Sequence, residues 1–340
     1  MIAALWGGGI ALLLSLLSLL QIAWLRSRLR ARERLAERCL NKWRPMFNAI
    51  LAGDEGMALP PLEAREGVYF LKLWLHFQIS LRGGTRELLN NMARRLGADA
   101  RARSFLEHGS LSERALAALA LGYLADRSCL ETMRRQSVHP DRLLSFHARW
   151  ALIQIDPEVE VRHAIRALVA GEWSVREAAG VLQESMATVE GAFLEALPRE
   201  SEDGALILLL QLADALALSP PGEMLEPLLR HPEMEIKAGA LKLCGDPTLK
   251  AAVLELMGHE DWRVRLQAVR ALGRFAEPED VFALAHLLTD PEWWVRYRSA
   301  QALAQLPFLR APQVVALAEA ANDPYARDIV RQVLAESAAR

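Results

Sequence analysis

The stretch Asp261–Leu306, DWRVRLQAVRALGRFAEPEDVFALAHLLTDPEWWVRYRSAQALAQL, contains one pattern twice. Val264-Arg265 is followed by a small residue and an Ala-Leu pair, and 31 residues later Val295-Arg296 is followed in the same way. A fixed period of this length is typical of stacked structural repeats. The sequence therefore predicts that this part of the chain is an array of similar units.

Each unit is predicted to consist of two helices joined by a short turn. Apolar residues recur at helical spacing in VFALAHLL of 281–288, and again in steps of three and four after Val295. The Asp290-Pro291 pair separates the two helices, because Asp caps helices and Pro is tolerated in the first turn. Small residues such as Ala268 and Ser299 allow helix axes to approach to roughly 8 Å. One pair cannot bury its apolar face alone, so the units must stack.

The inner position of this pattern can be followed along most of the chain. At intervals of 28 to 31 residues it falls on Ala117, Ala148, Ala179, Leu210, Ala240, Ala268, Ser299 and Val330. The unit of residues 186–218 departs from the pattern, because it has no Arg and places Leu210 where others have a small residue. Its register stays open. We predict an all-α fold with about eight helix pairs over residues 99–340.

The Asp-Pro turn, the Val-Arg pair and the Ala and Leu that follow resemble HEAT repeats, including those grouped with phycobilisome lyases. The resemblance is specific for residues 240–334 and weaker before them. It implies an α-solenoid in which the second helices line a concave face. It also implies that Arg265 and Arg296 bond to acidic residues between neighbouring units and have a structural role.

Residues Ile2–Leu25 carry no charged side chain. As a helix, 24 residues at about 1.5 Å each extend roughly 36 Å, which is enough to span the hydrocarbon core of a bilayer. A cleaved signal peptide is the alternative, but it needs a basic start, a shorter apolar run and a small-residue cleavage site. The start is uncharged and the run ends in arginines. We therefore expect residues 2–25 to be an uncleaved single-pass transmembrane anchor.

A basic segment follows this stretch, and residues 26–61 are predicted to be a juxtamembrane arm and linker. Five arginines should lie against anionic headgroups: Arg26, Arg28, Arg30, Arg32 and Arg34. Because positive residues favour the cytoplasmic side, we expect the N-terminus outside and the solenoid in the cytoplasm, at the inner membrane of a bacterium. Three widely separated cysteines agree with a reducing compartment.

Residues 62–98 are predicted to cap the first repeat. We expect Pro45 to end the basic arm, and 54–61, with Gly56 and two prolines, to form a loop. The large apolar residues of 63–81 then predict an amphipathic helix, because the terminal unit of a solenoid needs a special outer face. Attachment of this helix to the membrane surface is the alternative.

No motif in the sequence points to a catalytic, cofactor or metal site. There is no HExxH spacing, Walker loop, GxGxxG or GxSxG. The chain carries −2 in total and residues 26–44 contribute +6, so the remainder carries −8. A nucleic-acid binder usually has the opposite balance. We therefore expect no enzyme, no cofactor, no metal and no nucleic-acid partner.

Aromatic and basic residues gather where the last second helices begin. The predicted partner-binding residues are Trp262, Arg263, Trp293, Trp294, Tyr297 and Tyr325. Trp, Tyr and Arg are the residue types that dominate hot spots of protein interfaces. The alternative is that some of these rings only pack over the turn between the two helices of a unit.

The sequence thus predicts a non-enzymatic, membrane-tethered scaffold that holds a protein partner at the cytoplasmic face of the inner membrane. Envelope or exopolysaccharide assembly is one possible setting. The resemblance to HEAT repeats also admits an enzyme or enzyme accessory, of the bilin lyase or DNA glycosylase type. A sensor with its input through the anchor is a third class.

Overall fold

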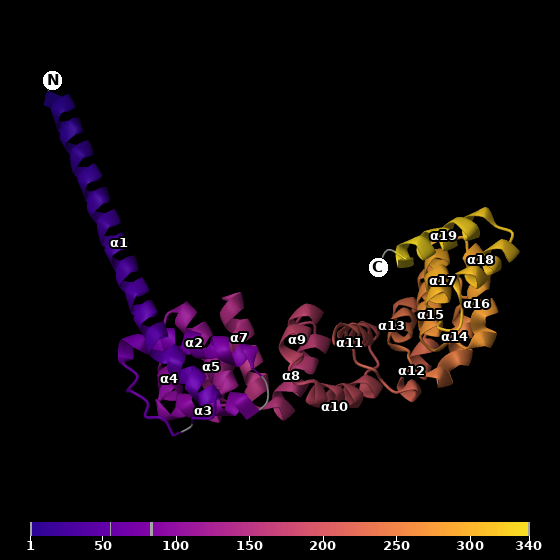
Figure 1. Cartoon of the computed structure of the whole chain (residues 1–340), viewed down its shortest axis with the longest axis horizontal. Coiled ribbons are helices and arrows are strands. Elements are labelled where there is room, and N and C mark those ends of the chain that lie inside the picture. Colours follow the sequence, from indigo (N-terminus) through magenta and orange to yellow (C-terminus); the bar gives the residue numbers. More distant parts are fainter. Residues whose placement is uncertain (1, 55, 82–83, 339–340) are drawn as a thin grey trace. The chain divides into compact units, whose positions relative to one another are not determined.

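The regular structure of the described chain is entirely helical (Figure 1). The computed structural model describes residues 2–54, 56–81 and 84–338, with side chains described at 17, 19–31 and from 33 to 337 in those ranges. Contacts divide the chain after Pro157 into two compact units. The first unit contains α1 (Ile2–Leu51), α2 (Gly67–Ser80), α3 (Gly84–Arg95), α4 (Ala98–His108), α5 (Leu111–Tyr123), α6 (Leu130–Ser137) and α7 (Arg142–Ile155).

The second unit continues with twelve α-helices, the first of which starts at Pro157. They are α8 (Pro157–Val169), α9 (Val175–Leu182), α10 (Met186–Ala196), α11 (Asp203–Ala215), α12 (Gly222–Leu229), α13 (Met234–Leu243), α14 (Lys250–Leu256), α15 (Trp262–Phe275), α16 (Val281–His286), α17 (Trp293–Gln305), α18 (Ala311–Ala320) and α19 (Pro324–Ala338). Short 3-10 helices join some of them: η1 (Ala64–Glu66), η2 (Arg127–Cys129), η3 (Leu197–Arg199), η4 (Pro247–Leu249), η5 (Pro278–Asp280) and η6 (Leu287–Thr289). From α4 to α19 the helices form eight consecutive pairs, the number that the repeat pattern predicts.

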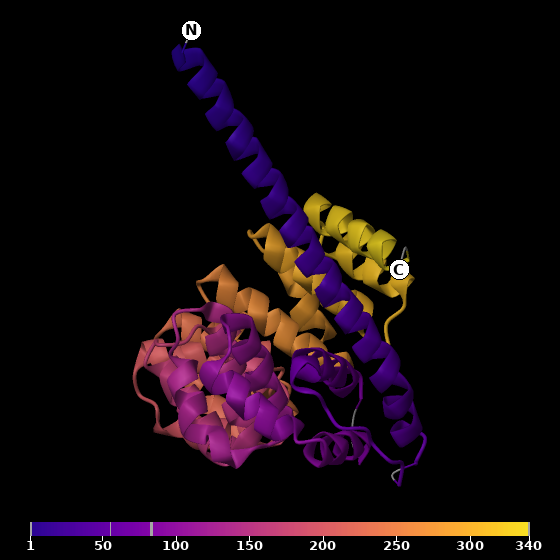
Figure 2. The same ribbon diagram turned by 90° about the vertical axis from the view of Figure 1, so that its left-hand side faces the viewer.

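The first helix continues through Pro45, so the prediction that Pro45 ends the basic arm is wrong (Figures 1 and 2). A proline inside a helix removes one backbone hydrogen bond and costs about 3 kcal/mol or more. The fully buried Trp43 and Phe47 on either side of it offset that cost. Their rings pack on α2, where Trp43 meets Phe70 edge-on at 5.0 Å and Phe47 stacks on Phe77 at 5.1 Å.

In the described part of the chain, no helix combines the length and the apolarity needed to cross a membrane. Most of the predicted anchor, residues 2–25, has side chains that lie outside the described residues. The anchor is therefore not confirmed. The described side chains of this stretch are exposed, with Leu19 at 62% and Trp24 at 55%.

The helix predicted at 63–81 corresponds to η1 and α2. It packs against α1, α3, α4 and α5, and its Trp74 is fully buried with the indole N–H donating to the Leu89 carbonyl at 3.0 Å. Because α2 contacts both helices of the first pair, it covers the apolar face that this pair would otherwise expose.

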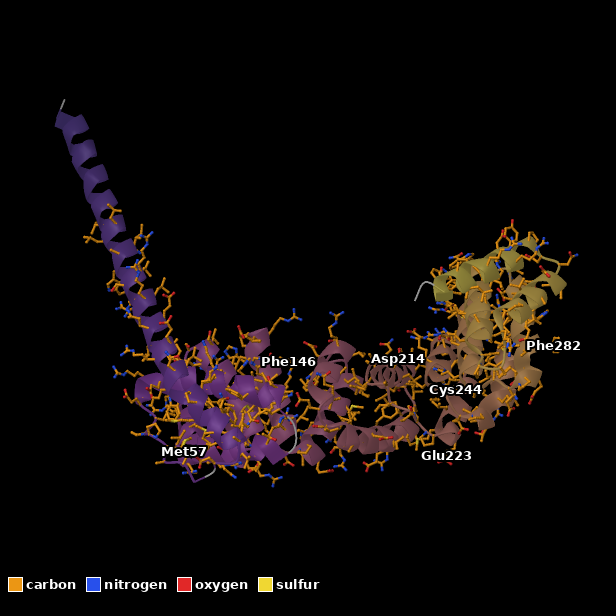
Figure 3. The ribbon with its side chains drawn as sticks, in the orientation of Figure 1. Met57, Phe146, Asp214, Glu223, Cys244 and Phe282 are labelled. Carbon is orange, nitrogen blue, oxygen red and sulfur yellow. The ribbon has the colours of Figure 1, made fainter. Side chains whose placement is uncertain are left out.

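In the second unit the helix pairs form two layers. The second helices α11, α13, α15, α17 and α19 pack on one another in sequence, and the first helices α12, α14, α16 and α18 lie along their other side (Figure 1). Phe282 on α16 belongs to this outer layer and is 76% exposed (Figure 3). The inner layer is the face on which the resemblance to HEAT repeats implies binding.

The predicted inner positions are buried where the second helices meet. Ala240, Ala268 and Ser299 have no exposed surface, as close packing of helix axes requires. The assignment of Ala179 is wrong by one residue, because Ala178 is the fully buried residue of α9 and Ala179 is only half-buried.

The irregular unit around Leu210 keeps the phase of the array. Leu210 is 2% exposed on α11, so the large residue occupies the position that Ala fills elsewhere. Gly239 on α13 faces it, and a Cβ added there would lie 3.0 Å from a Leu210 methyl carbon. The missing side chain of Gly239 therefore makes room for Leu210, and a small residue is still present at this contact.

Candidate partner-binding surface

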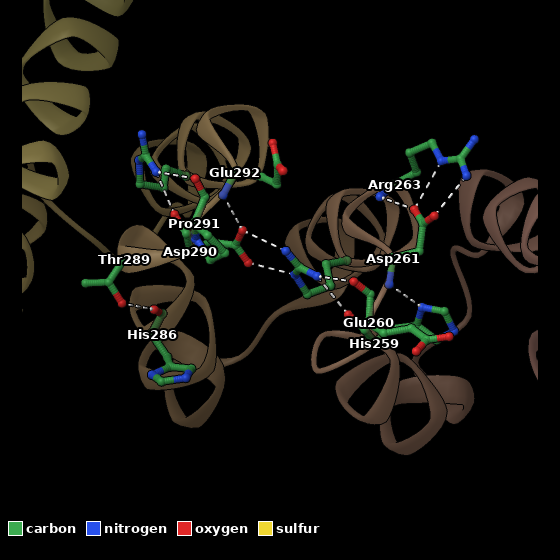
Figure 4. A network of polar contacts seen from close by, with 11 residues as sticks. His259, Glu260, Asp261, Arg263, His286, Thr289, Asp290, Pro291 and Glu292 are labelled. Atoms are coloured by element: carbon green, nitrogen blue, oxygen red, sulfur yellow. Dashed lines mark hydrogen bonds and ion pairs between the residues drawn. The ribbon is translucent and has the colours of Figure 1, made fainter.

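The turn before a second helix is held by a side chain that accepts a backbone N–H two residues later. His259 Nδ1 accepts from Asp261 N at 3.0 Å, and Asp290 Oδ1 accepts from Glu292 N at 2.8 Å (Figure 4). His231 has the same role one unit earlier. These acceptors satisfy backbone donors that a helix start leaves without an intrahelical partner. The histidines of the turns thus have a structural explanation.

A buried ion pair joins two consecutive units (Figure 4). The Arg265 guanidinium on α15 donates to both carboxylate oxygens of Asp290, at 2.7 and 2.9 Å. The two side chains are only 12% and 3% exposed. Arg265 also donates to the carbonyls of His259 and Glu260, both at 2.9 Å. The hydrogen bond to Asp290 raises the pKa of Arg265 above its ordinary value, and the arginine is structural, as the resemblance implies.

Arg296 occupies the equivalent position on α17 but has no such carboxylate. Its Nη1 donates to the carbonyls of Asp290 and Pro291, at 2.6 and 3.0 Å, as Arg265 does one unit earlier. The residue that corresponds to Asp290 is Ala321, 31 positions later. The Nε–H of Arg296 is buried and has no hydrogen-bond partner among the described residues. The expected acidic partner in the next unit is therefore absent from the described chain.

Four of the predicted site residues lie at the last two repeats, and three of them form one aromatic cluster. The rings of Trp293 and Trp294 meet edge-on at 4.7 Å, and those of Trp293 and Tyr297 stack at 5.0 Å. Tyr325, on α19, lies under the Arg296 guanidinium at 5.6 Å from Cζ to the ring centroid. Exposed fractions are 39% for Trp293, 51% for Trp294 and 66% for Tyr325.

Tyr297 is the anchored member of the cluster. Its hydroxyl donates to a Glu336 carboxylate oxygen at 2.6 Å and accepts from the Gln301 amide at 2.9 Å. The ring is half-buried, and the Arg298 guanidinium lies 5.9 Å from its centroid. Tyr297 therefore positions the stacked Trp293, which matches the alternative that some rings pack over the helix start.

Trp262 and Arg263 lie one unit earlier, at the start of α15. Trp262 is half-buried. Arg263 is exposed, and its guanidinium donates to both carboxylate oxygens of Asp261, at 3.1 and 2.8 Å. The hydrogen bond from Arg263 lowers the pKa of Asp261 to about 2. Arg263 thus already has a carboxylate partner, unlike Arg296.

The candidate surface is defined here as Trp293, Trp294, Arg296 and Tyr325, supported by Tyr297. Sequence reasoning assigned Arg296 a structural role and missed it as a member of the surface. The signal was available, because moving 31 residues from Asp290 leads to Ala321 instead of a second acidic residue.

The other predicted and chemically competent residues fall elsewhere. Arg26, Arg28, Arg30 and Arg34 are exposed on α1, whereas the side chain of Arg32 lies outside the described residues. The search of the described residues found no group of three His, Cys, Asp or Glu side chains that could hold a metal ion. Cys39, Cys129 and Cys244 are free and buried, and burial raises the pKa of each thiol.

A cavity of about 770 Å³ lies between α14 and α16, next to the network of Figure 4. Its polar lining includes His259, Asp290 and Thr289. The first two already accept turn N–H groups, and the Thr289 hydroxyl donates to the His286 carbonyl at 3.0 Å. These groups are engaged in holding the turns, which gives the cavity a structural context.

The comparisons with known proteins identify the class of repeat. The family model for HEAT repeats matches residues 222–304 and 250–339, so this part of the chain consists of HEAT repeats, as predicted. No curated protein matches the chain. Among solved structures, the chain is similar to "The structure of the complex of CpcE and CpcF of phycocyanin lyase from Nostoc sp. PCC7120". The identity is 16%, covering 82% of this chain and 97% of that chain, with a TM-score of 0.28.

Proposed function

We propose that the chain is a non-enzymatic HEAT-repeat scaffold that binds a protein partner through the candidate surface. One observation carries the proposal: Trp294 and Tyr325, at the same position of consecutive repeats, are each more than half exposed beside the Arg296 guanidinium. Exposed Trp, Tyr and Arg in one cluster have the composition of an interface hot spot. The inner layer of a solenoid is also an extended surface suited to binding another protein.

Packing over the turn does not account for all of the rings. Tyr297 is fixed by two hydrogen bonds and supports Trp293, so its position has an internal explanation. Trp294 contacts Trp293 but leaves 51% of its surface in solvent, and Tyr325 leaves 66%. Removing apolar ring surface from water is favourable by roughly 25 cal/mol per Å². A partner that covers Trp294 and Tyr325 gains this free energy.

The scaffold is further proposed to be tethered to the inner membrane of a bacterium, with the N-terminus outside and the repeats in the cytoplasm. Support comes from the uncharged Ile2–Leu25 stretch, from the exposed apolar side chains Leu17 to Leu25, and from the arginines that follow. An envelope or exopolysaccharide assembly is the setting to examine first. A cytoplasm-active reporter at the C-terminus should be active and a periplasm-active one inactive; the reverse pattern would refute this orientation.

The double variant Trp294→Ala plus Tyr325→Ala tests partner binding. Loss of one aromatic hot spot costs about 2 kcal/mol or more, roughly thirtyfold in affinity. We expect the double variant to keep the melting temperature of the natural chain and to lose a partner that crosslinks to it in membranes. Crosslinked material identified by mass spectrometry is compared between the two proteins.

Phe282→Ala is the matched control, because this exposed aromatic lies on the outer layer (Figure 3). It should retain both stability and the crosslinked partner. A strongly destabilised double variant would instead mean that the rings are core, since a buried aromatic costs about 3–5 kcal/mol when removed. A stable double variant that still captures the same partner would refute the proposed surface.

A further inference from the structure

Basic side chains on consecutive second helices reach forward to one position in the next repeat. Lys237 Nζ on α13 lies 3.4 Å from His259 Nε2, and Arg265 on α15 holds both oxygens of Asp290. In each case the residue contacted is also the one that caps the following turn. The contact therefore couples one repeat to the start of the next.

The series is interrupted at its last basic member. Arg296 keeps the two bonds to the turn carbonyls behind it, but the position in front of it is Ala321, which has no polar side-chain atom. The turn there is also different, because Asn322 adopts a left-handed conformation with φ +52°. The arginine thus retains a buried Nε–H that no described residue accepts. A buried donor without an acceptor is unfavourable, and an incoming acceptor would remove that penalty.

We propose that the protein partner supplies this acceptor: an acidic segment whose carboxylate binds Arg296 as Asp290 binds Arg265. This inference rests on the proposed function and specifies the chemistry that the surface selects. The planar guanidinium matches a carboxylate with two parallel hydrogen bonds. Tyr325, two thirds exposed, can shift as the carboxylate enters, and its ring above Cζ uses none of the N–H donors.

The charges around Arg296 favour an anionic ligand. Arg298 lies two residues further along the same helix and faces the Tyr297 ring. Glu336 is occupied by the Tyr297 hydroxyl and the Gln332 amide, at 2.6 and 2.9 Å. Glu292 is exposed one turn earlier on α17, and no ion pair joins it to Arg296 in the part of the chain that the structure describes. The guanidinium edge is therefore not neutralised by a carboxylate of its own helix.

The test uses random twelve-residue peptides displayed on phage and selected on the purified full chain. Selected peptides should be enriched in Asp and Glu, and their synthetic, fluorescein-labelled forms are titrated by anisotropy. We expect Arg296→Gln to weaken binding at least tenfold and Arg296→Lys to weaken it less, because Lys keeps the charge and loses the fork. Exchanging the acidic residues of the peptide for Asn and Gln should have the effect of Arg296→Gln. Arg270→Gln, an exposed arginine of α15, should leave binding unchanged.

The outcomes separate this inference from the proposed function. Peptides that require Trp294 and Tyr325 but show no acidic preference, or bind Arg296→Gln and the natural chain equally, would refute the inference and leave the surface intact. Peptides that bind equally well after Trp294→Ala plus Tyr325→Ala, or a selection that yields no binder, would refute both. Melting temperatures are recorded for all variants, and Arg296→Lys decides the result if Arg296→Gln is destabilised.

Discussion

The ion pair between Arg265 and Asp290 offers the sharpest test of how neighbouring repeats are coupled. The perturbation is Asp290→Ala, which removes both acceptors of the guanidinium and the oxygen that caps Glu292 N. Because Asp290 is 3% exposed and the Arg265 side chain 12%, the arginine charge would be left nearly buried and without its partner. Breaking a buried pair in this way costs about 3–5 kcal/mol.

Asp261→Ala is a control of the same chemistry. Asp261 also caps a second helix and also receives two hydrogen bonds from an arginine, but that arginine, Arg263, has a side chain that is 59% exposed. Solvent compensates an exposed charge, so the loss of stability should be clearly smaller. The comparison therefore isolates burial from capping and from ion pairing.

The assay is denaturant unfolding followed by circular dichroism, combined with hydrogen exchange resolved to α15 and α17. Asp290→Ala should accelerate exchange in both helices, because stacked repeats are coupled through their interfaces. The double change Arg265→Met plus Asp290→Leu should recover most of the stability, since apolar residues of similar size often replace a buried pair without loss. Equal losses for Asp290→Ala and Asp261→Ala, or a loss under about 1 kcal/mol for Asp290→Ala, would refute the reasoning.

Three further predictions concern packing and titration. Ala268→Leu should lower the free energy of unfolding by roughly 1–3 kcal/mol through overpacking, and an unchanged melting curve would contradict the assigned helix phase. Burial lowers the pKa of His147 below its ordinary 6.5; the unfolded chain then binds more protons below that pH, so the free energy of unfolding should fall as pH drops through 6.5, and His147→Gln should remove this slope. Burial raises the pKa of Cys39 to about 11 and of Cys129 to about 12, so both thiols should resist iodoacetamide near pH 8 until the chain unfolds; rapid labelling of the folded chain would show that they are accessible.

The repeat architecture could be predicted from the sequence because its causes are local. A small residue every 28 to 31 positions marks where helix axes must approach closely, and this requirement is met inside each unit. The same reasoning explains its one error of phase, at Ala179. Neighbouring positions of a helix face differ by about 100°, so two adjacent alanines, Ala178 and Ala179, fit the pattern almost equally well, and only the packed structure distinguishes them.

Pro45 and Arg296 show what the sequence by itself could not decide. Proline usually ends a helix, but Trp43 and Phe47 bury their rings on α2 and keep α1 continuous, and that contact is formed with a segment far along the chain. Arg265 and Arg296 stand in nearly identical local sequences, yet one is neutralised by Asp290 and the other has only Ala321 in front of it. Period and side-chain size determined the helices and their stacking, because these are properties of neighbouring residues. The partner of each buried charge depended on the tertiary structure, because a carboxylate stabilises a guanidinium only when folding brings the two within hydrogen-bonding distance.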